Sequence, residues 1–194
     1  MITGISALWV ALCLSSAALA QGDAAPRWGL PELMQELHAV SSARGNFVET
    51  KYLAVLSAPL ELSGTLAYRA PDRLEKRTVK PVAERLVLEG NRLTIEDRRQ
   101  QRSYALERNP TMRAFVESMR STLAGDLNTL DRFYEVRLAG ERGGWRLTLT
   151  PRDATMQSFV SEIRISGRSA WVDTIELLDP NGDRSVMRIS PDSP

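Results

Sequence analysis

Apolar and polar side chains alternate along most of the chain from Asn46 onward. Alternation with a period of two places every second residue on the same face, which is typical of a β-strand with one buried side. In segment 61–69, Leu62, Leu66 and Tyr68 share one face, and polar side chains occupy most of the other. Segments of this kind recur about eleven times, so the sequence predicts a mainly β protein built on an antiparallel sheet.

Tight turns are predicted between several of these segments. Gly90-Asn91 and Asn181-Gly182 each stand between two alternating segments. A glycine–asparagine pair in this setting is a strong short-range signal of a β-hairpin. We therefore expect strands that are consecutive in the chain to be neighbours in the sheet.

Two stretches have the helical period of 3.6 residues instead. The first is Leu30–Val40, with Pro31 in its first turn, and Gly45 is predicted to end it. The second follows Pro110 and is predicted to end at Gly125. This amphipathic helix is either a movable lid over the apolar face of the sheet or an ordinary packed helix. Its apolar stripe comprises Met112, Phe115, Val116, Met119 and Leu123.

Two helices can cover only part of the apolar face of a sheet with about eleven strands. We therefore expect the sheet to curve into an incomplete (unclosed) antiparallel β-barrel whose lumen the helices fill only in part. A core packed without any cavity is the alternative that periodicity leaves open. The residues predicted to line a lipid-binding cavity are Leu62, Leu66, Tyr68, Leu86, Leu88, Trp145, Leu147, Phe159, Ile163 and Trp171.

The first twenty residues contain no charged side chain, and the apolar run within them is too short to span a bilayer. Small residues follow this run, and Ala18-Leu19-Ala20 fits the rule for signal peptidase cleavage. We predict a signal peptide over residues 1–20, cleaved after Ala20, and a single domain over residues 21–194. An uncleaved membrane anchor is the alternative. A cleaved chain would contain no cysteine, so we expect no disulfide framework.

Charge gives no bulk attraction to nucleic acid, because 25 basic residues stand against 24 acidic ones. Catalysis has few candidate groups, since His38 is the only histidine and no nucleophile or phosphate-loop motif accompanies it. Asp179, Asn181 and Asp183 have the first spacing of a calcium loop, but the loop's glycine and glutamate positions do not match, so a hairpin turn is favoured. We expect no enzymatic activity, no catalytic residue, no metal and no cofactor.

Three stretches, taken in order, resemble the LolA family of periplasmic lipoprotein carriers. They are LMQELHAVSSARGNFVETKYL, SGTLAYRAPDRL and WRLTLTPRDATMQSFVSEIRIS, the last followed by VDTIELLDPNGDRSVMRI. The resemblance implies an incomplete antiparallel barrel lidded by helices. It also implies a periplasmic carrier that shields the acyl chains of a lipoprotein between an inner-membrane exporter and an outer-membrane acceptor. For such a shuttle we expect a monomer.

One departure from that family concerns the second stretch. In the best-known carriers an arginine precedes the proline and helps to hold the lid closed. Here Ala70 stands at that position and Arg69 one place earlier, on the strand face opposite Tyr68. Both are candidate lid or entrance residues. The alternatives are a related carrier of a free acyl lipid that works with an inner-membrane exporter, a periplasmic lipoprotein sensor, and an esterase that uses His38.

Overall fold

The computed structural model describes residues 28–108 and 110–192, with side chains described at all of these except 110–112, 114 and 115. The predicted signal peptide, residues 1–20, and its cleavage site after Ala20 lie outside the described residues. Within the described part of the chain, no helix has the length and the apolar character needed to cross a membrane.

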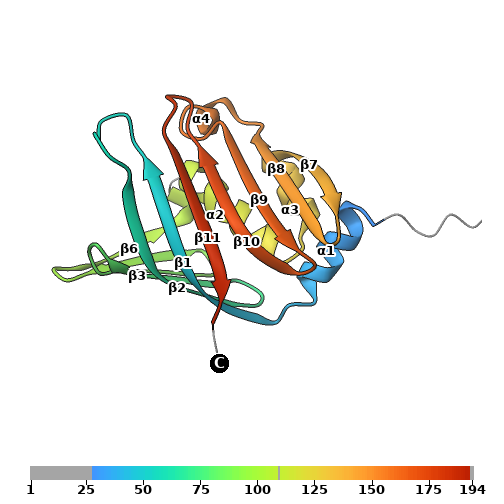
Figure 1. Cartoon of the computed structure of the whole chain (residues 1–194), viewed down its shortest axis with the longest axis horizontal. Coiled ribbons are helices and arrows are strands. Elements are labelled where there is room, and N and C mark those ends of the chain that lie inside the picture. The colour runs from blue at the N-terminus through green and yellow to red at the C-terminus, as the bar shows by residue number, and fades with distance from the viewer. Residues whose placement is uncertain (1–27, 109, 193–194) are drawn as a thin grey trace, which may run out of the picture.

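One antiparallel sheet of eleven strands forms the body of the protein, in the order β6-β5-β4-β3-β2-β1-β11-β10-β9-β8-β7. Two meanders of consecutive hairpins meet at the central β1–β11 pair (Figure 1). The edge strands β6 and β7 do not pair with each other, so the curved sheet is an incomplete barrel, as predicted. The strands are β1 Ser42–Tyr52, β2 Leu60–Arg69, β3 Arg73–Lys80, β4 Glu84–Glu89, β5 Arg92–Asp97, β6 Gln101–Ala105, β7 Tyr134–Glu141, β8 Gly144–Pro151, β9 Glu162–Arg168, β10 Trp171–Leu178 and β11 Arg184–Pro191.

The helices lie on the concave side of the sheet (Figure 1). The predicted N-terminal helix is α1, Leu30–His38. The predicted insertion between β6 and β7 contains α2, Pro110–Leu123, followed by α3, Leu127–Phe133. A 3₁₀ turn, Leu106–Arg108, and the short helix α4, Ala154–Gln157, were not predicted. Both are single turns, which carry too little hydrophobic periodicity to be recognised in a sequence.

The end of α1 differs from the prediction. The helix begins after Gly29, whose N–H donates to Glu32 Oε2 at 2.8 Å, and it ends at His38. The prediction that Gly45 ends this helix was wrong, because Gly45 lies within β1. A Cβ atom at Gly45 would lie 2.7 Å from the carbonyl oxygen of Ser190 in β11. The glycine therefore allows the close approach of β1 and β11.

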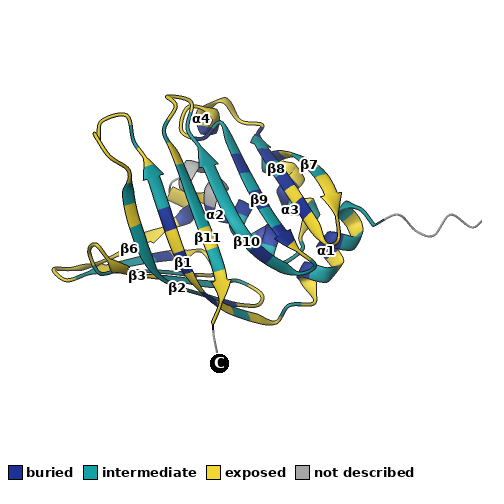
Figure 2. Cartoon of the chain, in the orientation of Figure 1, coloured by how far each residue is buried: buried dark blue, intermediate teal, exposed yellow. Residues whose placement is uncertain are grey.

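The apolar face of the sheet is divided into two parts that are covered differently (Figure 2). Strands β7, β8 and β9 pack against α1, α3 and α4 in a fully buried core. Over β1, β2, β10 and β11 most inward-facing apolar residues are only half-buried. The buried core consists of Leu33, Met34, Leu37, Leu130, Tyr134, Trp145, Leu147, Leu149, Met156, Val160, Ile163, Ile165 and Val172, and a smaller cluster under α2 consists of Leu88, Leu93, Leu106 and Val116.

Candidate functional site

A cavity of about 580 Å³ lies in the less covered part of the concave face, between β1–β5, β10, β11 and α2. Its volume falls within the range of about 300–1,000 Å³ that is usual for small-molecule sites. The lining is mainly aliphatic, with few polar groups. Its large apolar members are Leu37, Val40, Leu53, Leu66, Tyr68, Leu74, Leu86, Leu88, Leu93, Val116, Met119, Leu123, Trp171, Val172, Ile175, Leu177, Met187 and Ile189.

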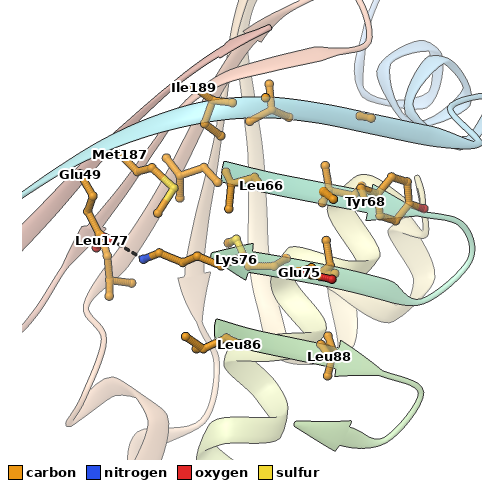
Figure 3. Close-up of a pocket in the computed structure, with 18 of the residues that line it drawn as sticks. Glu49, Leu66, Tyr68, Glu75, Lys76, Leu86, Leu88, Leu177, Met187 and Ile189 are labelled. Atoms are coloured by element: carbon orange, nitrogen blue, oxygen red, sulfur yellow. Dashed lines mark hydrogen bonds and ion pairs between the residues drawn. The ribbon is translucent and has the colours of Figure 1, made fainter. Parts of the chain in front are cut away.

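Five of the ten residues predicted to line a cavity do line it. Leu66 and Tyr68 project from β2, and Leu86 and Leu88 project from β4 (Figure 3). Trp171 completes the five at the start of β10. On β2 and β4 the alternation of the sequence identified the inward face correctly. The five residues are Leu66, Tyr68, Leu86, Leu88 and Trp171.

The prediction was wrong for three residues of β8 and β9. Trp145, Leu147 and Ile163 also face inward, but they belong to the buried core under α1, α3 and α4. Leu147 and Ile163 are completely buried. The ring of Trp145 packs on Gly167 of the neighbouring strand, and its Nε1–H donates to the carbonyl of Ser169 at 2.8 Å. Helices fill this part of the lumen, so these side chains face other side chains and not a cavity.

Phe159 and Leu62 were also wrongly assigned to the cavity. Phe159 is 57% exposed, because it lies in the turn between α4 and β9, and β9 begins only at Glu162. Leu62 is half-buried on β2, opposite Glu49 of β1. At this level the cavity is lined by Glu49, whose carboxylate forms an ion pair with Lys76 of β3, and not by Leu62.

Helix α2 covers the cavity with the side chains of Val116, Met119 and Leu123. These residues belong to the apolar stripe predicted for the lid. The other two predicted lid residues, Met112 and Phe115, lie in α2, but their side chains are outside the described part of the chain. Movement of α2 as a lid stays a prediction.

Ala70 and Arg69 occupy different environments. Ala70 lines a second cavity of about 400 Å³ with His38 and Gly125, where the ends of α1 and α2 meet the β2–β3 turn. His38 Nδ1 lies 2.9 Å from the carbonyl oxygen of Ala124, at the end of α2. Arg69 is exposed and lines neither cavity. Arg69 therefore does not take the place of an arginine at position 70.

A charged cluster on the inner face was missed by the sequence analysis. Glu49 of β1 is 5% exposed and accepts a hydrogen bond from Lys76 of β3, which crosses the inner face to reach it (Figure 3). Ser185 Oγ donates to Glu49 Oε1 at 2.6 Å, and Lys51 Nζ lies 3.6 Å from the same oxygen. Lys76 Nζ also lies 4.9 Å from the ring centroid of Phe47. The alternation of β1 and β3 does place these residues inward, and that signal was available in the sequence.

Burial opposes ionisation of Glu49, but its surroundings outweigh that effect. Hydrogen bonds from Lys76 and Ser185, together with the charges of Lys76 and Lys51, hold the pKa of Glu49 below its ordinary value. The carboxylate is therefore ionised at neutral pH. Glu49 and Lys76 form a charged pair inside an otherwise apolar lining.

Metal binding finds no support among the described residues, where no three or more His, Cys, Asp or Glu side chains are grouped to hold an ion. The segment compared with a calcium loop forms the β10–β11 turn instead. Asp183 N–H donates to Asn181 Oδ1 at 3.1 Å, and Asp183 Oδ1 accepts from Ala54 N–H at 2.7 Å. Asn181 Oδ1 and Asp183 Oδ1 therefore accept backbone hydrogen bonds that stabilise the turn.

Comparison with known families shows to which family the chain belongs. A family model described as outer membrane lipoprotein carrier protein LolA-like matches residues 24–189. The chain belongs to this LolA-like family. No curated protein matches the sequence.

Several solved structures resemble this LolA-like protein. They include a LolA superfamily protein, NE2245, from Nitrosomonas europaea, with 11% identity and a TM-score of 0.41 over 84% of this chain and 93% of that one. The MucA/MucB complex of Pseudomonas aeruginosa has 13% identity and a TM-score of 0.46 over 84% and 56% of the two chains. LprF from Mycobacterium bovis has 10% identity and a TM-score of 0.37 over 83% and 89%. At TM-scores this low, these likenesses add nothing to the family assignment.

The division of the inner face can be tested by truncating one leucine in each part. Leu147→Ala removes a completely buried side chain from the core and should lower the free energy of unfolding by about 2–5 kcal/mol. Leu66→Ala only widens an existing cavity and should cost about 1 kcal/mol. Urea denaturation of both variants measures the difference. Equal losses would show that the cavity does not exist in solution.

The ionised state of Glu49 predicts a pH dependence of stability. Its lowered pKa means that the ionised group stabilises the folded protein above the ordinary glutamate pKa, and that this stabilisation disappears as the pH falls through the folded pKa. Glu49→Gln should therefore lower the free energy of unfolding by about 1–3 kcal/mol at pH 7, and the difference from the wild type should shrink towards pH 3.

The matched control for this measurement is Glu61→Gln, on an exposed glutamate of β2. It should leave stability almost unchanged at every pH. A loss in Glu49→Gln that stays constant down to pH 3 would contradict an ionised, stabilising Glu49.

Proposed function

We propose that this LolA-like protein is a periplasmic carrier that shields lipoprotein acyl chains in its cavity and shuttles them from the inner to the outer membrane. The observation that supports it is a mainly aliphatic cavity of about 580 Å³ under α2, in a chain that belongs to the LolA-like family. In this proposal an inner-membrane exporter is the donor, an outer-membrane protein is the acceptor, and the mature monomer begins after Ala20. The protein is not an enzyme.

The energetics suit a reversible carrier. Each buried CH₂ group contributes about 0.8 kcal/mol, so one long acyl chain offers roughly 12 kcal/mol of gross transfer free energy. Immobilising the chain and displacing α2 would oppose this gain. Binding strong enough to withdraw a chain from water can thus stay weak enough for release to an acceptor.

A second candidate function is carriage of a free acyl lipid with an inner-membrane exporter. Two observations favour it. Ala70 stands where the best-known carriers have the arginine that holds the lid, and Arg69 is exposed and lines neither cavity. The charged residues Glu49 and Lys76 also line the cavity, and these could meet a polar head group.

The test that distinguishes these candidates is the identity of the natural cargo. The mature protein would be purified from the periplasm without detergent, and any bound molecule identified by native mass spectrometry. A bound lipoprotein is the expected result, whereas a bound free acyl lipid would establish the second candidate. A protein that carries neither, and that also refuses an acyl probe, would contradict both.

Binding in the cavity predicts the effect of a charge on its wall. Leu66→Arg places a long cation in the middle of the apolar lining and should weaken binding of a fluorescent fatty acid at least roughly tenfold, because an acyl chain cannot solvate the guanidinium. Circular dichroism would show that the variant folds. The matched control is Phe159→Arg, on an exposed side chain outside the cavity, and it should bind normally.

If Leu66→Arg does not fold, Leu66→Trp offers a second route, because it fills the same space without a charge. Unchanged probe binding in a folded Leu66 variant would show that acyl chains bind elsewhere.

A further inference from the structure

Three turns project from one end of the sheet. They connect β1 to β2 (residues 53–59), β3 to β4 (81–83) and β5 to β6 (98–100). Because consecutive strands are antiparallel, every second turn lies at the same end of the sheet. Figure 1 shows the three turns on the side of the molecule away from α1, and Figure 2 shows that most of their residues are exposed.

Exposed apolar side chains are concentrated at these turns. Val55, in the β1–β2 turn, is 89% exposed, and the next residue, Leu56, is also exposed. Val82, in the β3–β4 turn, is 63% exposed, and Val79 is exposed near the end of β3. These four make up half of the eight large apolar side chains that are exposed among the described residues. The hairpin turns at the opposite end of the sheet carry none of them.

The same turns carry positive charge and no acidic residue. Arg98 and Arg99 lie in the β5–β6 turn, and Lys80 ends β3 beside the β3–β4 turn. All three are exposed, and none of them forms an ion pair within the described part of the chain. In a chain whose net charge is only +1, these cations are a local excess at the turns.

The acidic residues nearest to these turns lie farther back, on the strands. Glu61 and Glu84 lie on β2 and β4, and the register of β3 with β4 places Lys80 two residues beyond Glu84. Glu96 and Asp97 of β5 form ion pairs with arginines of β4 and β6. The outermost charges of the three turns are therefore positive.

The cavity reaches the same end of the sheet. Leu53, the first residue of the β1–β2 turn, lines it, whereas the four exposed apolar side chains and the three cations do not. The other turns at this end, β8–β9 and β10–β11, carry Asp153, Asp179 and Asp183. The apolar and cationic surface is thus confined to the β1–β6 half of this end and lies next to the cavity.

We propose that the β1–β2, β3–β4 and β5–β6 turns form a docking surface for an anionic lipid bilayer. Apolar side chains enter the boundary between head groups and acyl chains, and nearby cations attract anionic head groups. Docking places the Leu53 end of the cavity at the bilayer, so an acyl chain passes between them with little exposure to water. This surface rests on the proposed function, because a carrier must load or unload its acyl cargo at a membrane.

The test is sedimentation of the protein, purified from the periplasm, with lipid vesicles. One set of vesicles is pure phosphatidylcholine, and the other set also contains phosphatidylglycerol. Each basic residue near an anionic surface strengthens binding by a factor of about five, so we expect at least roughly tenfold tighter binding to the anionic vesicles at low salt. High salt should remove most of this difference, because it screens the charges.

Two double variants separate the two contributions. Arg98→Gln with Arg99→Gln should weaken binding to anionic vesicles roughly tenfold and leave binding to phosphatidylcholine unchanged. Val55→Ser with Val82→Ser should weaken binding to both kinds of vesicle, because it removes apolar groups that enter any bilayer. Both variants should bind a fluorescent fatty acid normally, since none of the four side chains lines the cavity.

The matched controls remove the same kinds of group outside the three turns. Arg146→Gln with Arg188→Gln removes two exposed arginines from β8 and β11. Val48→Ser with Phe159→Ser removes two exposed apolar side chains from β1 and from the β8–β9 turn. Both controls should bind vesicles as the wild type does, and circular dichroism would show that all four variants fold.

Two outcomes would overturn the docking surface. One is a wild-type protein that binds neither kind of vesicle or does not prefer the anionic one. The other is unchanged vesicle binding in both turn variants, which would place membrane contact elsewhere on the protein. In both cases normal binding of the fatty acid would leave the carrier function standing. A wild type that binds no fatty acid would instead reject the carrier function, whatever the vesicles show.

Discussion

An eleven-stranded sheet with one apolar face has more surface to bury than its helices can cover. Curvature reduces the exposed area by turning the strands towards one another, but the edge strands β6 and β7 do not meet. Among the residues that the structure describes, the helices are therefore the only other cover of this face. α1, α3 and α4 pack over β7–β9, and α2 covers the rest incompletely. The cavity is the consequence of this unequal division.

The charged pair in the cavity has a physical cost that its partners offset. A carboxylate as buried as Glu49 would normally resist ionisation, yet hydrogen bonds from Lys76 and Ser185 keep it charged. Gly64 lies beside this pair on β2, and a Cβ there would meet the ring of Phe47 at 3.0 Å and the carbonyl oxygen of Arg77 at 1.9 Å. The glycine leaves room for the Phe47 ring, over which Lys76 reaches β1.

The mainly aliphatic lining of the cavity matches the proposed acyl cargo, because the burial of apolar surface is favourable but non-directional. Met119 and Leu123 of α2 cover part of this lining, and methionine is a side chain that adapts to irregular partners.

The sequence by itself determined the strands, the N-terminal helix and the helical insertion, because hydrophobic period and turn residues act locally. It also placed Leu66, Tyr68 and Leu86 on the inner face. Alternation predicts that Leu147 points inward just as Leu66 does. Leu147 nevertheless belongs to the buried core, whereas Leu66 lines the cavity. Only the tertiary structure distinguished the core residue from the cavity residue. Side chains with the same alternation pack against helices on one strand and line the cavity on another. The hydrophobic period of a strand predicts which face of the sheet a side chain occupies. Tertiary packing determines which other groups that side chain contacts.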